Sequence, residues 1–122
     1  MQNNSLKNLE QDLAGFIGTQ NYYRHSIGNF SYTDGVKYLA DTANCYWLLD
    51  VIGSHILKPR IRKILFQVWE LTVNENRNAV ITMREDTNLP AVVEQKIPFT
   101  DFPLKKIKLY FIDDVLMLPS EY

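Results

Sequence analysis

The stretch ILFQVWELTV, residues 64–73, decides the fold class, because apolar and polar residues alternate along its second half. Alternate residues of a strand lie on the same face of a sheet. Three apolar residues would therefore share one face: Trp69, Leu71 and Val73. This period of two is typical of a strand that buries one face, so we expect Trp69 to be a core residue.

The alternation returns in three later segments that are separated by short polar turns. The apolar positions that would share the buried face are Ala79, Ile81, Met83, Val93, Ile97, Phe99, Ile107, Leu109 and Phe111. A tight turn at Asp113 and Asp114 leads into a last apolar segment, residues 115–119. Alternating strands joined by short turns predict an antiparallel meander of four to five strands.

The first half of the chain has apolar residues at helical spacing instead. Residues 5–16 predict a short helix that begins after Asn4 or Ser5 and ends near Gly15 or Gly18. Its apolar face would consist of Leu6, Leu9, Leu13 and Phe16. A second helix would follow a cap at Thr33 or Asp34, with its own apolar face formed by Val36, Leu39, Ala40 and Ala43.

Asn44 either ends this second helix or is absorbed into a longer one. From Cys45 the helical pattern restarts, and a further apolar face is formed by Cys45, Leu48, Leu49, Ile52 and Ile56. Pro59 ends the helical half, because a residue that precedes proline is driven out of helical geometry. We predict one α+β domain over residues 1–122, with two or three N-terminal helices packed against the C-terminal meander.

Overall composition excludes several classes of protein. The chain has 122 residues, 46% hydrophobic and 22% charged, and a net charge of -1, which indicates a globular protein without a general attraction to nucleic acid or anionic membranes. Cys45 is the single cysteine, so a reducing cytoplasm is the expected setting. We expect neither a signal peptide nor a membrane span.

Six blocks of the sequence, taken in order, resemble a known family. They are FIGTQNYYRH, YTDGVKYLA, YWLLDVIGS, FQVWEL, TDFPL and LPSEY. The pattern is similar to a small bacterial family catalogued only as a domain of unknown function, number 6876, over roughly residues 13–122. The resemblance implies a small free-standing bacterial protein of plasmid, phage or other mobile-element contexts, with an accessory or interaction role. It implies no activity and no catalytic residues.

Metal and nucleophile chemistry have little support in the sequence. His25, His55 and Cys45 are the only nitrogen or sulfur ligands, and no two of them have the spacing of a zinc site. The five glycines form no phosphate-binding loop, and we expect no cofactor. Cys45 lies on an apolar helix face, where a cysteine is usually a small core residue.

The candidate site lies in NYYRHSIGNFSYTDG, residues 21–35, which reads as two ring-rich extended segments around a turn at Gly28 and Asn29. The candidate ligand- or partner-binding residues of this stretch are Tyr22, Tyr23, Arg24, His25, Tyr32 and Asp34. Aromatic rings suit a binding surface, Arg24 could hold an anion, and His25 could exchange a proton with a ligand. Structural scaffolding is the competing interpretation, in which Asp34 acts chiefly as a helix cap.

Tyr46, Asp50 and Ser54 form a polar stripe on the helix that follows Cys45. We add Tyr46 and Asp50 to the candidate binding residues, since an acid between hydroxyls could orient a ligand. If the protein has a pocket, it should lie where the 21–35 hairpin meets this stripe, with Arg24, His25 and Asp50 as its polar contacts. The competing interpretation is a partly solvated helix face.

Two basic clusters could together bind nucleic acid if they shared one edge. They are Lys58, Arg60, Arg62 and Lys63, and Lys105, Lys106 and Lys108. Solvated charge, balanced by Glu85, Asp86, Glu94 or Asp113, is the favoured interpretation, so nucleic-acid binding is not expected.

The sequence favours a non-enzymatic protein-interaction or accessory module of a bacterial or mobile-element system. The alternative is a pocket for a small ligand or a nucleotide, built from Arg24, His25, Asp34 and Asp50, which could also hydrolyse its ligand. A sheet surface with exposed rings would favour the first function, and a deep cleft where His25 and Asp50 converge would favour the second.

Overall fold

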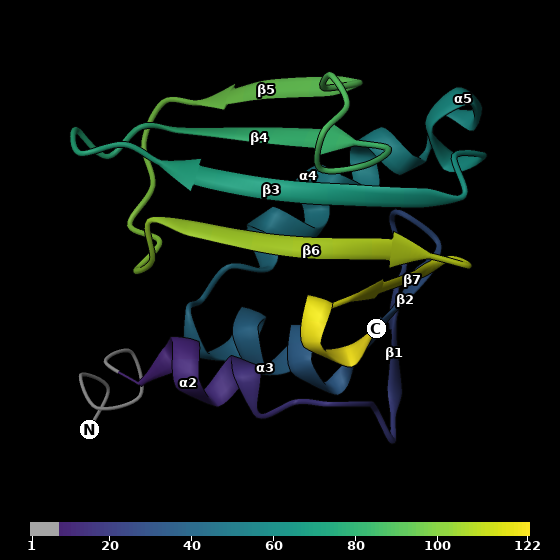
Figure 1. The fold of residues 1–122 in the computed structure, drawn as a ribbon, viewed down its shortest axis with the longest axis horizontal. Helices are drawn as coiled ribbons and strands as arrows, with labels where there is room; N and C mark the ends of the chain where they lie inside the picture. Colours follow the sequence, from purple (N-terminus) through teal and green to yellow (C-terminus); the bar gives the residue numbers. More distant parts are fainter. Residues whose placement is uncertain (1–7) are drawn as a thin grey trace.

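The computed structural model describes residues 8–122 and shows an α+β fold built on one seven-stranded sheet (Figure 1). The helices are α2 (Leu9–Ala14), α3 (Asp34–Thr42), α4 (Tyr46–Ile56), α5 (Pro59–Arg62) and a terminal 3₁₀ turn, η1 (Pro119–Glu121). The strands are β1 (Tyr22–His25), β2 (Phe30–Thr33), β3 (Phe66–Val73), β4 (Ala79–Arg84), β5 (Val93–Ile97), β6 (Lys106–Ile112) and β7 (Val115–Met117).

The strand order is β1-β2-β7-β6-β3-β4-β5. This order differs from the simple meander that the sequence predicts. Strands β3, β4 and β5 form a meander, but β6 then returns to the other side of β3. The N-terminal hairpin also joins the sheet, through a parallel pairing of β2 with β7. The C-terminal half does contain five strands, β3 to β7, that pair antiparallel with one another, but they are not a simple meander, and with the hairpin the sheet has seven strands and is mixed.

The parallel pairing could not be predicted from the sequence, because it is short and joins distant parts of the chain. Ser31 lies opposite Val115, and Tyr32 lies opposite Leu116. Two residues on each side leave no periodic signal in a sequence, and nothing local to the hairpin indicates a partner about eighty residues later.

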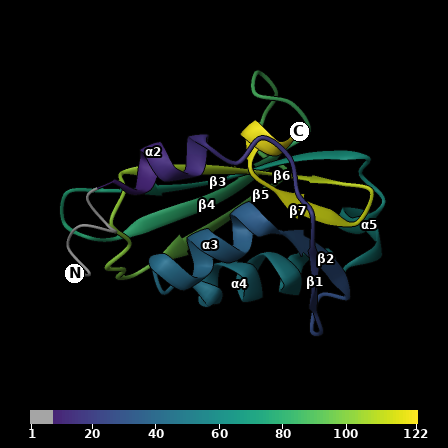
Figure 2. The same cartoon turned by 90° about the horizontal axis from the view of Figure 1, so that it is seen from below.

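Helices α3 and α4 cover one face of the sheet and bury the alternating apolar residues (Figure 2). Trp69 is 1% exposed, which confirms the predicted strand register. Its indole N–H donates to Oε1 of the buried Gln67 at 2.9 Å. The Gln67 amide in turn donates to the carbonyl of Ile61 at 2.8 Å, so this polar pair is satisfied inside the core.

The predicted helix faces are confirmed by burial. The buried residues of α3 and α4 include Val36, Leu39, Ala40, Leu48, Leu49, Ile52 and Ile56, and Ala43 and Cys45 next to them are also buried. Thr33 is the N-cap of α3, since its hydroxyl accepts the N–H of Val36. Asn44 has a φ of 53° and separates α3 from α4, so the two helices are not continuous.

Three local predictions need correction. Phe99 is 68% exposed and lies beyond the end of β5, so it is not a core residue. Lys58 is extended, as predicted for the residue before Pro59, but Pro59 does not end the helical half, because it begins the short helix α5, where proline fits the first helical position. The first helix spans Leu9–Ala14, and the proposed contributions of Asn4, Ser5 and Leu6 fall outside the described residues.

Candidate functional site

His25 joins the N-terminal hairpin to helix α4. Its ring is 8% exposed and stacks on Phe30 with the ring centroids 4.7 Å apart. Nδ1 accepts the N–H of Gly28 at 3.0 Å, so Nε2 carries the proton and donates to Oδ1 of Asp50 at 2.8 Å. Both ring nitrogens therefore have hydrogen-bond partners within the fold.

The close packing at this junction requires two glycines. A Cβ on Gly53 of α4 would lie 2.8 Å from Cε1 of His25 and 3.3 Å from the Cα of Gly28. A Cβ on Gly28 would in turn lie 2.9 Å from the Cα of Gly53. The hairpin and the helix thus touch backbone to backbone beside the His25–Asp50 pair, in which His25 is buried and the Asp50 side chain is 57% exposed.

Arg24 does not join His25 and Asp50. Its guanidinium donates to the side chain of Asn29 across the hairpin turn. A second arginine, Arg62, approaches this turn from α5 and donates to the carbonyls of Gly28 and Asn29. Arg24 thus bonds to a side chain of the turn and Arg62 bonds to its backbone, so the geometry gives no support to a hydrolytic centre of Arg24, His25 and Asp50.

Asp34 anchors the segment that leads into the hairpin, which corrects its predicted role as a cap. Its Oδ2 accepts the N–H of Gln20 at 2.9 Å and that of Asn21 at 3.2 Å, and its Oδ1 accepts the Tyr23 hydroxyl at 3.0 Å. These hydrogen bonds lower the pKa of the Asp34 carboxyl to about 2, and the bond from the Gln20 N–H makes the largest contribution. The capping function belongs to Thr33 instead.

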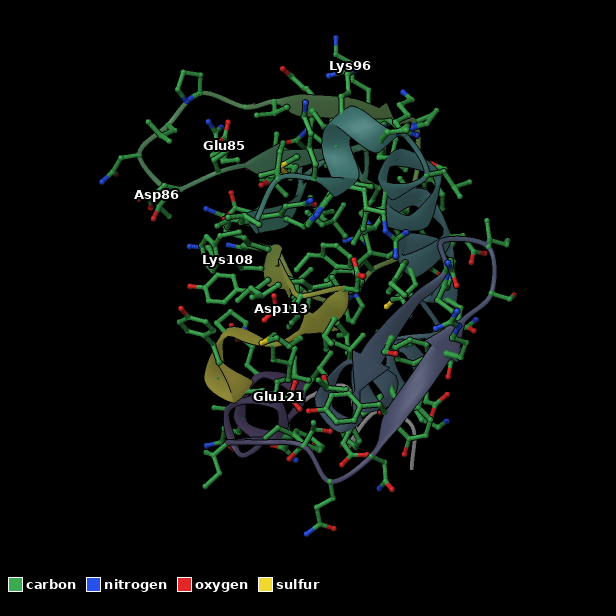
Figure 3. All side chains as sticks on the ribbon, turned by 90° about the vertical axis from the view of Figure 1, so that its right-hand side faces the viewer. Glu85, Asp86, Lys96, Lys108, Asp113 and Glu121 are labelled. Carbon is green, nitrogen blue, oxygen red and sulfur yellow. The ribbon has the colours of Figure 1, made fainter. Side chains whose placement is uncertain are left out.

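A second carboxylate, Glu121, reaches the same helix start from the other end of the chain. Oε1 accepts the Thr33 hydroxyl at 2.6 Å, and Oε2 accepts the N–H of Gly35 at 3.0 Å. Figure 3 labels Glu121 beside the 3₁₀ turn that follows β7. An anion is stabilised at a helix N-terminus by the free N–H groups there. No local pattern predicts this contact, and its only signal in the sequence is the LPSEY block at residues 118–122.

Several of the predicted tyrosines do come together. Tyr23 and Tyr32 stack with their centroids 5.7 Å apart, and Nζ of Lys37 lies 5.4 Å from the Tyr23 ring centroid. Lys37 also pairs with Asp41 at 2.8 Å, and Asp41 accepts the Tyr46 hydroxyl. Burial is the first cause that raises the pKa of Tyr46 to about 12, and the bond to Asp41 adds to it. These side chains therefore contact one another through hydrogen bonds, an ion pair and ring packing.

The remaining predicted residues are dispersed. Tyr22 is 62% exposed on the first strand, and the Ser54 hydroxyl donates to the carbonyl of Val51 in its own helix. The polar stripe of α4 therefore splits: Tyr46 contacts α3, Asp50 contacts the hairpin, and Ser54 contacts neither.

Cys45 is buried, and desolvation raises the pKa of its thiol to about 12. A thiol with such a pKa stays protonated at neutral pH and is a poor nucleophile. Within residues 8–122, no three His, Cys, Asp or Glu side chains are grouped to hold a metal ion. In the same part of the chain, no helix has the length and apolar character that crossing a membrane requires.

The two basic clusters lie at opposite ends of the sheet. β6 begins at Lys106, which pairs with Thr72 at the far end of β3, whereas α5 precedes the start of β3 at Phe66. Arg62 also forms an ion pair with Asp114 at 3.3 Å, and Lys106 lies 3.8 Å from Glu70. The clusters do not combine into one cationic surface, so the geometry lends no support to nucleic-acid binding.

The sheet face opposite α3 and α4 is a feature that the sequence analysis did not identify as a site. Figure 1 looks onto this open face along β3, β4 and β6. The register places its side chains in rows across β3, β6 and β7: Phe66 with Ile112 and Val115, then Val68 with Tyr110 and Met117, then Glu70 with Lys108. One end of the open face is therefore apolar and the other end is charged.

Three aromatic rings gather at the apolar end. Phe66 lies 5.0 Å from Tyr110 and 5.8 Å from Tyr122, and the two tyrosines are 5.6 Å apart, measured between ring centroids. Tyr122 is 76% exposed. We call this the ring cluster. It could have been suspected from Phe66 and Tyr110, which fall on the polar side of the alternation although they are large and apolar.

Two cavities of the described part of the chain have none of Arg24, His25 and Asp50 in their walls. One of about 410 Å³ is bounded by α2, by the edge of β6 where β7 does not reach, and by η1, with Leu13, Ile107 and Leu118 in its wall. Another of about 220 Å³ lies between α5 and the β6–β7 turn, against Arg62 and Asp114.

Comparison with known proteins identifies the family of this chain and nothing further. The model of a "Family of unknown function (DUF6876)" matches residues 7–122, nearly the whole chain, so the chain belongs to that family and the resemblance seen in the sequence is confirmed. No curated protein matches, and no solved structure matches.

Proposed function

We propose that this DUF6876 protein is a non-enzymatic protein-interaction module that binds a protein partner through the open sheet face. The observation that carries the proposal is the ring cluster, Phe66, Tyr110 and Tyr122, on a face that α3 and α4 leave uncovered. The setting that we propose is the bacterial cytoplasm, as an accessory of a mobile-element system. A lone buried cysteine is compatible with such a reducing compartment.

The ring cluster has the properties of a binding hot spot. Tyrosine supplies a large contact area and loses little side-chain freedom on binding, because it has only two rotatable bonds. The three rings also fix one another, so less ordering is required when a partner docks. Around them, Ile112, Val115 and Met117 are half-buried, which extends the apolar surface beyond the rings.

The charged end of the open face indicates the chemistry of the partner. Lys108 is half-buried, stands two residues before Tyr110 on the same strand face, and forms no ion pair with another residue of 8–122. Figure 3 shows Lys108 on the open side of the sheet. We expect the partner to present a group of apolar side chains with a carboxylate beside it that reaches Lys108.

Photo-crosslinking in the native host tests the location of the surface. A photoreactive phenylalanine analogue would replace Tyr122 in one variant and Tyr22 in another, because both tyrosines are strongly exposed but lie on different surfaces. We expect a crosslinked protein, identified by mass spectrometry, from position 122 only. Crosslinks from position 22 alone would move the binding surface to the hairpin and contradict the proposal.

Binding of the purified partner then tests the residues. Tyr110→Ala should weaken the affinity at least tenfold, as hot-spot truncations do. Lys108→Glu should also weaken the affinity, and the loss should be larger at low salt than at high salt because salt screens the charge. Tyr22→Ala is the matched control and should bind like the wild type. An affinity unchanged by both open-face substitutions, with the melting temperatures preserved, would rule out this surface.

A further inference from the structure

Strand β5 is the last strand in the sheet order. Within residues 8–122 it pairs with β4 alone, so its other edge is free of any strand in this part of the chain. Figures 1 and 3 both show β5 at the rim of the molecule, and Figure 3 places Lys96 at that rim. The outward backbone N–H and C=O groups of such a strand are a template on which another strand can pair.

Proline, which would prevent a strand from pairing, is absent from β5. Residues 93–97 contain no proline, since Pro90 precedes the strand and Pro98 follows it. The strand does carry charge, at Glu94 and Lys96, and both side chains are exposed. Neither one forms an ion pair with another residue of 8–122. Charges on an edge strand repel most incoming strands, unless the incoming strand has the opposite pattern.

The opposite pattern is found in the strand itself. The sequence of β5 is Val-Glu-Gln-Lys-Ile, and a second copy laid antiparallel about the central Gln95 brings each glutamate against a lysine. In this register Glu94 faces Lys96 of the other copy, Lys96 faces Glu94, and Val93 faces Ile97. The strand is thus complementary to itself in charge and in apolar character, which is what a two-fold interface requires.

We propose that β5 pairs antiparallel with β5 of a second copy of this chain, with Gln95 on the two-fold axis. The axis stands perpendicular to the sheet, so the two sheets become continuous and keep their helix-covered faces on the same side. This dimer uses the β5 edge and leaves the ring cluster free, so it stands independently of the partner surface proposed above.

An exposed apolar side chain follows the edge strand and would be covered by the same pairing. Phe99, which is 68% exposed, lies just beyond the end of β5. An antiparallel arrangement places the end of one strand beside the start of the other, so Phe99 of each copy approaches the residues that precede Val93 of its mate. Covering this ring removes apolar surface from water.

The proposal predicts a dimer that forms and dissociates with concentration, because a five-residue strand pair with one aromatic contact at each end is a small interface. Sedimentation-equilibrium measurements on the wild-type protein over a broad concentration series should fit a monomer–dimer equilibrium. A protein that sediments as a monomer throughout the series would overturn the proposal.

Charge reversal tests the register. Glu94→Lys places lysine against lysine twice in a homodimer, and Lys96→Glu places glutamate against glutamate twice. Each variant alone should dimerise at least about tenfold more weakly than the wild type, since opposite charges across a strand pair stabilise it and like charges oppose it. An equimolar mixture of the two variants restores both ion pairs and should form a heterodimer about as strong as the wild-type dimer.

Matched controls separate the edge from general charge effects. Glu75→Lys in the β3–β4 turn and Lys63→Glu after α5 make the same changes at exposed positions away from β5, and they should leave dimerisation unchanged. Melting temperatures should stay near the wild-type value, because Glu94 and Lys96 have no ion pair to lose within the chain. If the two variants do not heterodimerise, or if the controls weaken the dimer equally, the β5 register is wrong.

Discussion

At the scale of single residues, buried polar groups determine how much each substitution costs. Trp69 fills the centre of the core and also donates the hydrogen bond that Gln67 Oε1 accepts. Its side chain therefore contributes both apolar burial and the satisfaction of a buried acceptor, and two substitutions can separate these contributions.

Trp69→Ala should lower the free energy of unfolding by about 3–5 kcal/mol, because it removes a large buried side chain and leaves a cavity. Trp69→Phe keeps most of the volume but leaves Oε1 of Gln67 without its donor, which should cost about 1–3 kcal/mol. Urea denaturation followed by circular dichroism measures both. A loss below about 1 kcal/mol for the alanine variant would contradict the core position of Trp69.

The carboxylate of Asp34 should make stability depend on pH in the acid range. Its folded pKa, about 2, lies below the ordinary value of 3.8, so its contribution is complete above pH 3.8 and is lost as the pH falls towards 2. Asp34→Asn lacks this charge at every pH. The difference in urea midpoint between the wild type and Asp34→Asn should therefore shrink between pH 4 and pH 2. A difference that stays constant over this window would mean that the charge of Asp34 is not what holds the segment.

At the scale of elements, the docking of the hairpin on α4 depends on a missing side chain. In most helices a glycine-to-alanine change stabilises by up to about 1 kcal/mol. At Gly53 the added Cβ would meet the ring of His25 at 2.8 Å. That ring is held by Phe30, Gly28 and Asp50 and cannot turn aside without breaking these contacts.

Gly53→Ala should therefore destabilise the protein by about 1–3 kcal/mol, the cost of overpacking a close contact. Gly18→Ala is the control, because no atom lies within 4 Å of a Cβ added there, and its effect should stay within about 0.5 kcal/mol. Thermal and urea unfolding measure both variants. A stabilising Gly53→Ala would show that the hairpin does not pack on α4 as described.

At the scale of the whole molecule, the two ends of the chain hold each other. Strand β2 from the N-terminal half pairs with β7 near the C-terminus, and Glu121 bonds to Thr33 and to the N–H of Gly35 at the start of α3. A Cβ on Gly35 would lie 2.5 Å from Leu118, so the 118–121 segment lies directly against that helix start. The helical half and the sheet half thus share contacts at several points and should not unfold separately.

The two tryptophans provide a test of this cooperativity. Trp47 belongs to α4 and Trp69 to β3, so the variants Trp69→Phe and Trp47→Phe each retain one reporter, in the helical half and the sheet half respectively. Within each variant, the fluorescence transition in urea should coincide with the transition in far-ultraviolet circular dichroism. A fluorescence midpoint that departs from the dichroism midpoint would indicate that the two halves unfold independently.

The sequence by itself determined the elements whose signal is local. The alternation at Trp69 and Leu71 and the helical spacing from Val36 to Ile56 identified the core faces correctly, because burial of one face imposes a period that a short window reveals. The hairpin turn at Gly28 and Asn29 was also predicted, because glycine and asparagine are turn-forming residues. Asn29 indeed adopts the positive φ that such turns require.

Only the tertiary structure decided which elements are neighbours and what the polar residues do. The β2–β7 pairing, the return of β6 beside β3 and the bond from Glu121 to Thr33 join residues far apart in sequence, where no local period exists. The bonds of His25 to Gly28 and Asp50, and the close approach of Gly28 to Gly53, likewise join segments that lie apart in the sequence. The alternation does predict that one sheet face is buried, but the ring cluster on the other face needs the C-terminal Tyr122 to return beside Phe66 and Tyr110, a contact that no local pattern encodes.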